Sequence, residues 1–367
     1  MATRLLPRLL LAGGGLILAL GMIALLLTIF PELRPGGQRF VFTDLDGDTF
    51  RHQPGFVRPP AENRVLEDFI LHHDDDGLRQ PRMQADFYPI IALGDSYTEG
   101  GEVNWVDVLA ETLDTPVRNL GWRGFGPLEE AEIMRQFGGE DHRWVLVGYF
   151  EGNDLSNIQT AYAGELNIAR EAEFAQTTPE IVENDNYLYP LRHHTNGRDY
   201  DLAYISDYLW WLNGSPDVYR DSRNMALLRD ALAAIKSLAG DACVGLVYMP
   251  TKSHIYFQYT DPDGNRRFVL ENGLALQLDS EGWLSFGELS AQDEAQVFAN
   301  LDHQRDAVRD VADQLGIFFI DLTTAFLTAA ENEVTYYPYD SHWNARGHEL
   351  AGETVAQFLR DQEGCTP

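Results

Sequence analysis

Two kinds of hydrophobic pattern alternate along most of the chain. Short apolar runs, rich in β-branched or aromatic residues and bounded by Gly, Asn or Asp, predict buried strands at 88–93, 117–120, 144–149, 244–249 and 317–322. Longer segments with apolar residues at three- and four-residue spacing predict helices at 104–113, 127–137, 224–238, 291–315 and 345–359. This alternation predicts an α/β fold, a three-layer α/β/α sandwich around a five-stranded parallel sheet.

The alternation is interrupted before the sheet and twice within it. Residues 31–85 are rich in Pro, Gly and acidic turns, which predicts an irregular lead-in with a few short strands. The domain that follows, 86–367, contains two insertions. The first, near 155–223, is rich in Tyr and Trp; the second, near 255–290, contains the turn sequence DPDGN and predicts a β-hairpin.

The N-terminal segment 9–30 contains no charged side chain. A helix of this length covers the roughly 30 Å hydrocarbon core of a bilayer, so the segment predicts a transmembrane anchor. A cleaved secretory signal is the alternative, but its apolar region is usually only about 7–15 residues long and ends at an A-x-A-like site. Basic residues flank the span on both sides and orient it only weakly. We expect residues 1–8 in the cytoplasm and the domain in the periplasm or outside the cell.

Charge and cysteine content bear on the partners of the chain and on its cellular compartment. The 367 residues include 57 acidic and 27 basic side chains, a formal net charge of −30. Such a surface repels phosphates, which argues against a nucleic-acid partner. Cys243 and Cys365 agree with an oxidising compartment. They predict either a disulfide that fastens the C-terminus or two unrelated thiols.

Side chains suited to acyl transfer follow four of the predicted strands. They are Ser96 after the first, Gly124 after the second, Asn153 after the third, and Asp340 with His342 after the fifth. Because the carboxyl ends of parallel strands meet at one edge of the sheet, we expect these residues to lie together. A serine hydroxyl is a weak nucleophile until a base takes its proton, and His342 is the candidate base for Ser96. Asp340 would orient the imidazole and stabilise its charged form.

Three donors are available for the oxyanion of a tetrahedral intermediate: the N–H groups of Ser96 and Gly124 and the side-chain amide of Asn153. Taken singly, each motif also has an ordinary structural interpretation, as a turn, a helix N-cap or a surface histidine. Their joint occurrence at strand ends favours catalysis. The chain contains no phosphate-binding or dinucleotide-binding glycine motif, and we predict neither a cofactor nor a metal site.

The same blocks resemble those of the SGNH (GDSL-like) hydrolase family over roughly residues 89–359: GDSYTEG, NLGWRG, GND and DSHWNARGH. The resemblance implies Ser96 as nucleophile, Gly124 and Asn153 in the oxyanion hole, and His342 as base. The usual family Asp, three residues before the His, is replaced by Tyr339. Asp340 stands two residues before it, as in the branch that resembles the alginate O-acetyltransferases, although there the D-x-H precedes the nucleophile.

A further segment, MPTKSHIY, is similar to a P-x-K stretch of that branch. Its lysine, Lys252, could approach the site from the end of the fourth predicted strand, but a salt bridge at the surface is the interpretation we favour.

These observations predict a membrane-anchored serine esterase that acts outside the cytoplasm on a glycan or small-molecule ester. The glycan interpretation rests on the aromatic insertion, since aromatic rings stack on sugars, although such residues also pack an insertion onto its domain. An O-acyltransferase with the same residues is the alternative, because hydrolysis and transfer share an acyl-enzyme. A non-catalytic carbohydrate-binding domain is a third, weaker interpretation. No motif indicates a protein partner.

Overall fold

The computed structural model describes residues 57–58, 71–74, 76–162, 187–260, 262, 265–338, 340–362 and 365. Its central sheet has the strand order β11–β8–β5–β3–β4, and every neighbouring pair is parallel. The strands are β3 (Ile90–Leu93), β4 (Val117–Asn119), β5 (Trp144–Phe150), β8 (Cys243–Met249) and β11 (Phe318–Asp321). All five predicted strands are confirmed, with ends that differ by one or two residues.

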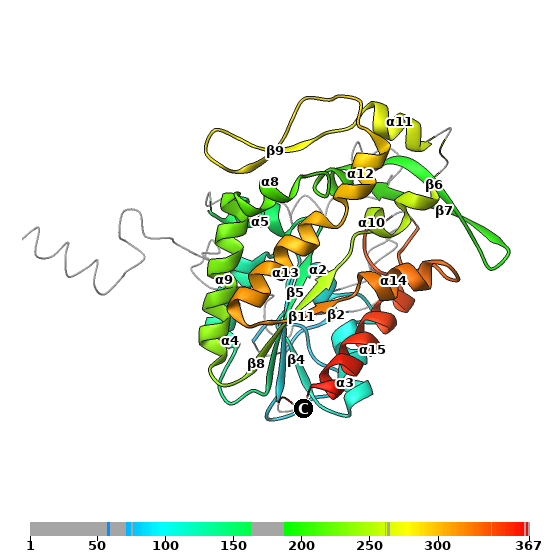
Figure 1. Ribbon diagram of the computed structural model, residues 1–367. Coiled ribbons are helices and arrows are strands. Elements are labelled where there is room, and N and C mark those ends of the chain that lie inside the picture. The colour runs from blue at the N-terminus through cyan, green and yellow to red at the C-terminus, as the bar shows by residue number, and fades with distance from the viewer. Residues whose placement is uncertain are drawn as a thin grey trace, which may run out of the picture.

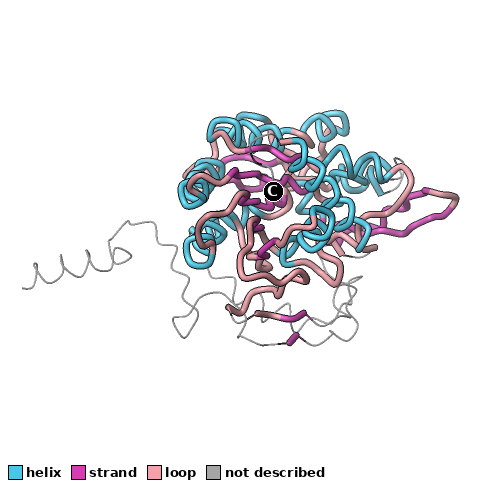
Figure 2. Tube along the Cα trace, turned by 90° about the horizontal axis from the view of Figure 1, so that it is seen from below, coloured by secondary structure: helices cyan, strands magenta, loops and turns pink. Residues whose placement is uncertain are grey.

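Helices cover both faces of this sheet, as Figures 1 and 2 show. One layer consists of α3 (Trp105–Leu113), α14 (Thr323–Ala330) and α15 (Ala345–Asp361). The other consists of α4 (Pro127–Phe137), α5 (Asp154–Tyr162), α9 (Arg223–Ala239) and α13 (His303–Leu315). Alternate residues of a strand enter different cores: Ile90 and Ala92 pack under the first layer, Ile91 and Leu93 under the second. The predicted three-layer sandwich is therefore confirmed.

The predicted single helix at 291–315 is wrong. The segment forms two helices, α12 (Glu294–Asn300) and α13, joined by a turn at Leu301 and Asp302. Val297 and Leu301 pack into the first core, whereas Val308 and Val311 pack into the second. One straight helix cannot face both cores, so the chain turns between them although its hydrophobic spacing continues.

The two insertions contain hairpins and short helices. The first contains β6 (Tyr187–Thr195) paired with β7 (Arg198–Ile205), then α7 (Ser206–Trp210) and α8 (Pro216–Arg220). The second contains α10 (Lys252–Tyr256), a 3-10 turn at Phe257–Tyr259, α11 (Asn265–Glu271), and β9 (Leu276–Leu278) paired with β10 (Leu284–Phe286).

The hairpin expected at DPDGN is wrong in position, because α11 begins at Asn265. The turn between β9 and β10 lies later, where the carboxylate of Asp279 accepts the N–H groups of Glu281 and Trp283 at 2.8 and 2.9 Å.

A short strand pair precedes the sheet, and a disulfide joins the sheet to the end of the chain. β1 (Val57–Arg58) pairs with β2 (Leu71–His72), in agreement with short strands in the lead-in. Cys243, at the start of β8, forms a disulfide with Cys365, which decides between the two alternatives for these cysteines. The predicted anchor at 9–30 lies outside the described residues. Within the part of the chain that is described, no helix has the length and hydrophobicity needed to cross a bilayer.

Candidate active site

The carboxyl ends of β3 and β5 form the crevice at which the strand order reverses, because the chain leaves β3 for β4 on one side and returns to β5 on the other. Ser96 follows β3 as the first residue of the short helix α2 (Ser96–Glu99). Gly94 has φ +149°, and a Cβ there would lie 2.1 Å from the hydroxyl of Thr98. Glycine thus permits the tight turn that places Ser96 at the edge of the sheet.

Ser96, His342 and Asp340 form a connected triad. The Oγ atom of Ser96 lies 2.7 Å from Nε2 of His342. The Nδ1 atom of His342 lies 2.6 Å from Oδ1 of Asp340, and the same oxygen accepts the backbone N–H of His342 at 2.7 Å. The structure therefore brings together the three residues that the sequence predicts, and it places Asp340 where the imidazole needs an acceptor.

The environment of Asp340 keeps it ionised. Burial alone would raise the pKa of this carboxyl, but the charge and hydrogen bonds of His342 and the ammonium of Lys252 hold it below its usual range. The side chains of His342 and Asp340 are still 24% and 20% exposed, so the triad is accessible from solvent.

Tyr97 packs against the imidazole of His342 and is hydrogen-bonded to the preceding residue. Its hydroxyl donates to the carbonyl of Ser341 at 2.5 Å, and its ring lies 4.9 Å from the imidazole ring, centroid to centroid. The N–H of Tyr337 donates to the carbonyl of His342 at 3.0 Å, which closes the loop that carries the triad's acid and base. A hydroxyl and a main-chain bond thus fix the loop on two sides.

The predicted oxyanion residues lie on the loops beside Ser96. Gly124 follows β4 with φ +84°, a left-handed conformation that glycine adopts without strain. Arg123, next to it, donates Nε to the buried carboxylate of Glu99 at 2.5 Å, which joins this loop to α2. Asn153 follows β5, the strand next to β3, and so lies at the same edge of the sheet as Ser96. Donation from Gly124 and Asn153 to an oxyanion stays a prediction.

Asp95 is a site residue that sequence reasoning missed. Its carboxylate caps α2 by accepting the N–H of Tyr97 at 2.9 Å. Burial raises its pKa to about 6, against the hydrogen bond from the N–H of Tyr97 and the charge of His342. Burial and repulsion from Asp95 also raise the pKa values of Glu130 and Asp154. Among the described residues, no group of His, Cys, Asp and Glu has an arrangement that could hold a metal ion.

The expected position of Lys252 is wrong. Its side chain is buried rather than at the surface, and its ammonium donates to main-chain carbonyls rather than forming a salt bridge. The carbonyls belong to β7 and to the loop before Asp340. Both segments are distant from Lys252 in the chain, so the residues around the lysine do not reveal these contacts.

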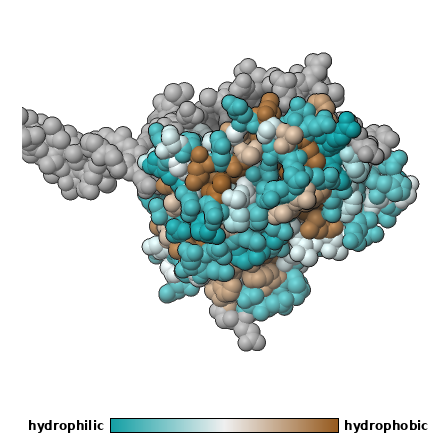
Figure 3. Space-filling model, turned by 45° about the horizontal axis from the view of Figure 1, so that its top comes forward, coloured by the Kyte–Doolittle hydropathy of each residue, from teal (hydrophilic) through white to brown (hydrophobic). Residues whose placement is uncertain are grey.

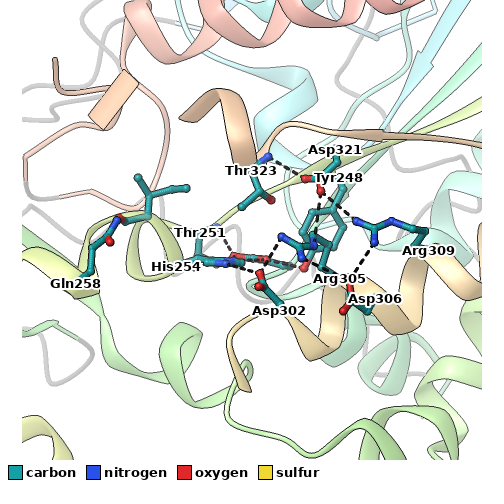
Figure 4. A network of polar contacts seen from close by, with 12 residues as sticks. Tyr248, Thr251, His254, Gln258, Asp302, Arg305, Asp306, Arg309, Asp321 and Thr323 are labelled. Carbon is teal, nitrogen blue, oxygen red and sulfur yellow. Dashed lines mark hydrogen bonds and ion pairs between the residues drawn. The ribbon is translucent and has the colours of Figure 1, made fainter. Parts of the chain in front are cut away.

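A second polar network, which the sequence did not predict, lies at the carboxyl ends of β5 and β8 (Figure 4). Glu151, at the end of β5, accepts hydrogen bonds from the Tyr248 hydroxyl, from Thr251 and from Nδ1 of His254. The other ring nitrogen of His254, Nε2, lies 3.3 Å from Oδ1 of Asp302. Burial alone would lower the pKa of His254, but the charges and hydrogen bonds of Glu151 and Asp302 raise it to about 9. The two carboxylates thus favour the charged form of this imidazole.

The comparison with protein families decides the class of the chain. A model of the GDSL-like lipase/acylhydrolase family matches residues 92–350, more than half of the sequence. The chain belongs to this family. It is a hydrolase that acts on esters, as the resemblance of its sequence blocks to SGNH hydrolases implied. The likeness to the alginate O-acetyltransferase branch is not confirmed, and no curated protein matches the chain.

Similar solved structures include other GDSL proteins. A member of the lipolytic G-D-S-L family from Veillonella parvula is 13% identical, with 74% of this chain and 98% of that chain covered and a TM-score of 0.35. Phospholipase A1 from Streptomyces albidoflavus is 13% identical, with 73% and 97% covered and a TM-score of 0.37. A catalytic mutant of an acetylxylan esterase from Geobacillus stearothermophilus is 12% identical, with 73% and 92% covered and a TM-score of 0.33.

Proposed function

We propose that this hydrolase is an extracytoplasmic, membrane-anchored serine esterase that removes acyl groups from a glycan. The observation that carries the catalytic part is the chain of contacts from the Ser96 hydroxyl through His342 to Asp340, at 2.7 and 2.6 Å. In this geometry the unprotonated Nε2 of His342 accepts the serine proton while Asp340 holds the proton on Nδ1.

The reaction follows from these positions. Ser96 Oγ attacks the ester carbonyl as His342 takes its proton, and the oxyanion is stabilised by the N–H groups of Ser96 and Gly124 and by the amide of Asn153. Collapse of the tetrahedral intermediate breaks the ester bond, and His342 returns the proton to the leaving alcohol. Water, deprotonated by His342, then attacks the acyl-serine and releases the acid and free Ser96.

The setting and substrate are supported by separate features. The Cys243–Cys365 disulfide fits an oxidising compartment, and the uncharged segment 9–30 fits an anchor that delivers the domain there. The described surface on the side of the strands' carboxyl ends is mainly hydrophilic, with separate hydrophobic patches (Figure 3). Such a surface suits a polar acylated glycan better than a lipid aggregate.

Labelling with a fluorophosphonate tests the catalytic part. The full chain, purified in detergent, should be labelled on Ser96, and the Ser96→Ala variant should not be labelled. Ser237→Ala removes an exposed hydroxyl on α9 and should be labelled like the wild type. Absence of labelling in the folded wild-type chain would contradict the serine mechanism and favour a binding domain.

Product analysis tests the reaction and the substrate. The wild-type chain is incubated with an acetylated glycan, and separately with an activated acetyl ester and an unmodified glycan. Free acetate from the first mixture supports deacylation. An acylated glycan in the second mixture would show that the enzyme transfers the acyl group and would contradict the proposed hydrolysis.

Carbonate extraction of membranes tests the anchor. We expect the intact chain in the membrane pellet. Recovery of the protein in the soluble fraction, shortened by cleavage after residues 9–30, would contradict the anchor.

A further inference from the structure

The helix α10 lies against the loop that carries Asp340 and His342. The carbonyl of Pro250, just before α10, accepts the hydroxyl of Tyr336 at 2.7 Å. At the other end of the helix, the hydroxyl of Tyr256 accepts the N–H of Thr335 at 3.2 Å. Both ends of α10 are thus bonded to the residues that lead into the triad loop.

Between these two contacts, Lys252 enters the loop itself. Its side chain is only 2% exposed. The Nζ atom donates to the carbonyls of Tyr337 at 2.7 Å, Pro338 at 3.4 Å and Ala203 at 2.6 Å. An ammonium has three N–H donors and no acceptor, so it matches three converging carbonyl oxygens.

These carbonyls lie where the β6–β7 insertion meets the triad loop. Ala203 donates its own N–H to the carbonyl of Pro338 at 2.7 Å, so β7 and the loop are bonded directly as well as through Lys252. Pro338 precedes Asp340 by two residues, and the carbonyl of His342 is bonded to the N–H of Tyr337. A displacement of Tyr337 or Pro338 would therefore also move Asp340 and His342.

The choice of residue is informative in this chain. It contains only two lysines among its 27 basic residues, and one of them occupies this buried position. Arginine has a planar group with five donors and cannot place three of them on carbonyls that converge on one atom. Burial lowers the pKa of Lys252 to about 7, and the nearby carboxylate of Asp340 opposes this effect.

We propose that Lys252 is a positioning residue for acyl transfer: its buried ammonium fixes the carbonyls of Tyr337 and Pro338 and so holds Asp340 and His342 against Ser96. This rests on the proposed serine mechanism. The lysine touches no reacting atom, and its effect on the rate passes through the imidazole.

The test compares Lys252→Met with the matched control Lys236→Met. Lys236, the other lysine, also donates to two main-chain carbonyls, those of Leu315 and Gly316 at the end of α13, away from the triad. The rate of hydrolysis of an activated acetyl ester is measured for the full chain and divided by the concentration of Ser96 that a fluorophosphonate titrates to completion. This quotient gives kcat per competent site and does not change when part of the protein is unfolded.

We expect kcat of Lys252→Met to fall about 10- to 100-fold with KM changed less than threefold, because a small displacement of the base slows chemistry more than binding. The rate of Ser96 labelling should fall with kcat, and Lys236→Met should retain the wild-type values. A kcat within twofold of the wild type in Lys252→Met, or an equal loss in Lys236→Met, would overturn the proposal.

If Lys252→Met does not accumulate as folded protein, Lys252→Gln is measured in the same way. Its amide keeps two N–H donors and loses the charge, so we expect a smaller loss of kcat, again with KM nearly unchanged. A wild-type kcat in this variant would equally overturn the proposal. Failure of the serine mechanism gives a different result, since Ser96 of the wild type would then not be labelled.

Discussion

The substitution Asp340→Asn separates two tasks of the triad carboxylate. Both hydrogen bonds from His342, those of its backbone N–H and of Nδ1, end on the same oxygen of Asp340, at 2.7 and 2.6 Å. An asparagine has one carbonyl oxygen with two lone pairs, which can accept both bonds. The backbone N–H requires an acceptor and thus holds that oxygen, rather than the amide nitrogen, towards the imidazole. The variant should keep the orientation and tautomer of His342 and lose only the negative charge.

The charge has a calculable effect on the transition state, in which His342 is an imidazolium. Two unit charges about 4 Å apart interact by about 4 kcal/mol at an effective dielectric constant of about 20. Because the side chains of Asp340 and His342 are 20% and 24% exposed, solvent screens part of this interaction. A loss of about 2–4 kcal/mol lowers kcat/KM by about 30- to 1,000-fold. Asp340→Ala also removes the acceptor and the tautomer control, so its loss should approach about 10,000-fold.

The assay is hydrolysis of an activated acyl ester by the full chain, normalised to titrated Ser96. Asp361→Asn changes a carboxylate at the end of α15 that contacts Gln357 and should leave the rate unchanged. An Asp340→Asn rate within fivefold of the wild type would mean that another group stabilises the imidazolium. Equal losses in Asp340→Asn and Asp340→Ala would refute the argument that one oxygen serves both bonds.

Three further substitutions or conditions test other parts of the structure. Asn153→Ala should lower kcat about 100- to 1,000-fold if its amide donates to the oxyanion, and a loss below tenfold in the acyl-ester assay would contradict that role. Since the folded pKa of His254 is raised to about 9, the stability that its charge contributes is fully present below pH 6.5 and is lost as the pH rises through 9. Partial exposure of Asp302 limits this contribution to about 2–3 kcal/mol. In urea unfolding at pH 6, 7.5 and 9, the wild type should therefore lose its advantage over His254→Gln as the pH rises, and a constant difference would exclude a charged His254. Reduction of the Cys243–Cys365 disulfide, which links residues 122 apart, should lower the free energy of unfolding by about 3–5 kcal/mol while Ser96 labelling persists, because the bond lies at the opposite edge of the sheet from the triad. Loss of labelling in reduced, folded protein would show that the site depends on the bond.

The sheet and the triad could be predicted because local pattern and topology agree. The central strands β3 and β5 are short apolar runs buried on both faces, and such runs are recognisable in one sequence. Parallel strands then bring their carboxyl ends to one edge, so Ser96 and His342 could be placed together although they are 246 residues apart. Asp340 was predicted from its position two residues before the imidazole, and the structure gives it the expected contact.

The errors share a cause, which is that the local pattern was compatible with more than one environment. The hydrophobic spacing of 291–315 continues through the turn at Leu301, and only the division of its residues between two cores explains why the helix ends there. DPDGN has the composition of a hairpin turn, yet its last residue, Asn265, begins α11, and the hairpin is closed later in the chain by Asp279.

Charged residues at the strand ends were the hardest to place, and the reason is physical. Burial of an ion is costly unless every donor or acceptor is satisfied, so a charged side chain in an unknown sequence is best assigned to the surface. Glu151 and Lys252 are exceptions because the fold supplies their hydrogen-bond partners. Four donors converge on the carboxylate of Glu151, and three carbonyls accept from the ammonium of Lys252. These partners come from segments far away in the chain. Both residues lie within three positions of the end of a strand whose last six residues are buried, at the edge where ligands bind. A charged residue at that edge of a parallel sheet is therefore more readily buried than its residue type alone suggests.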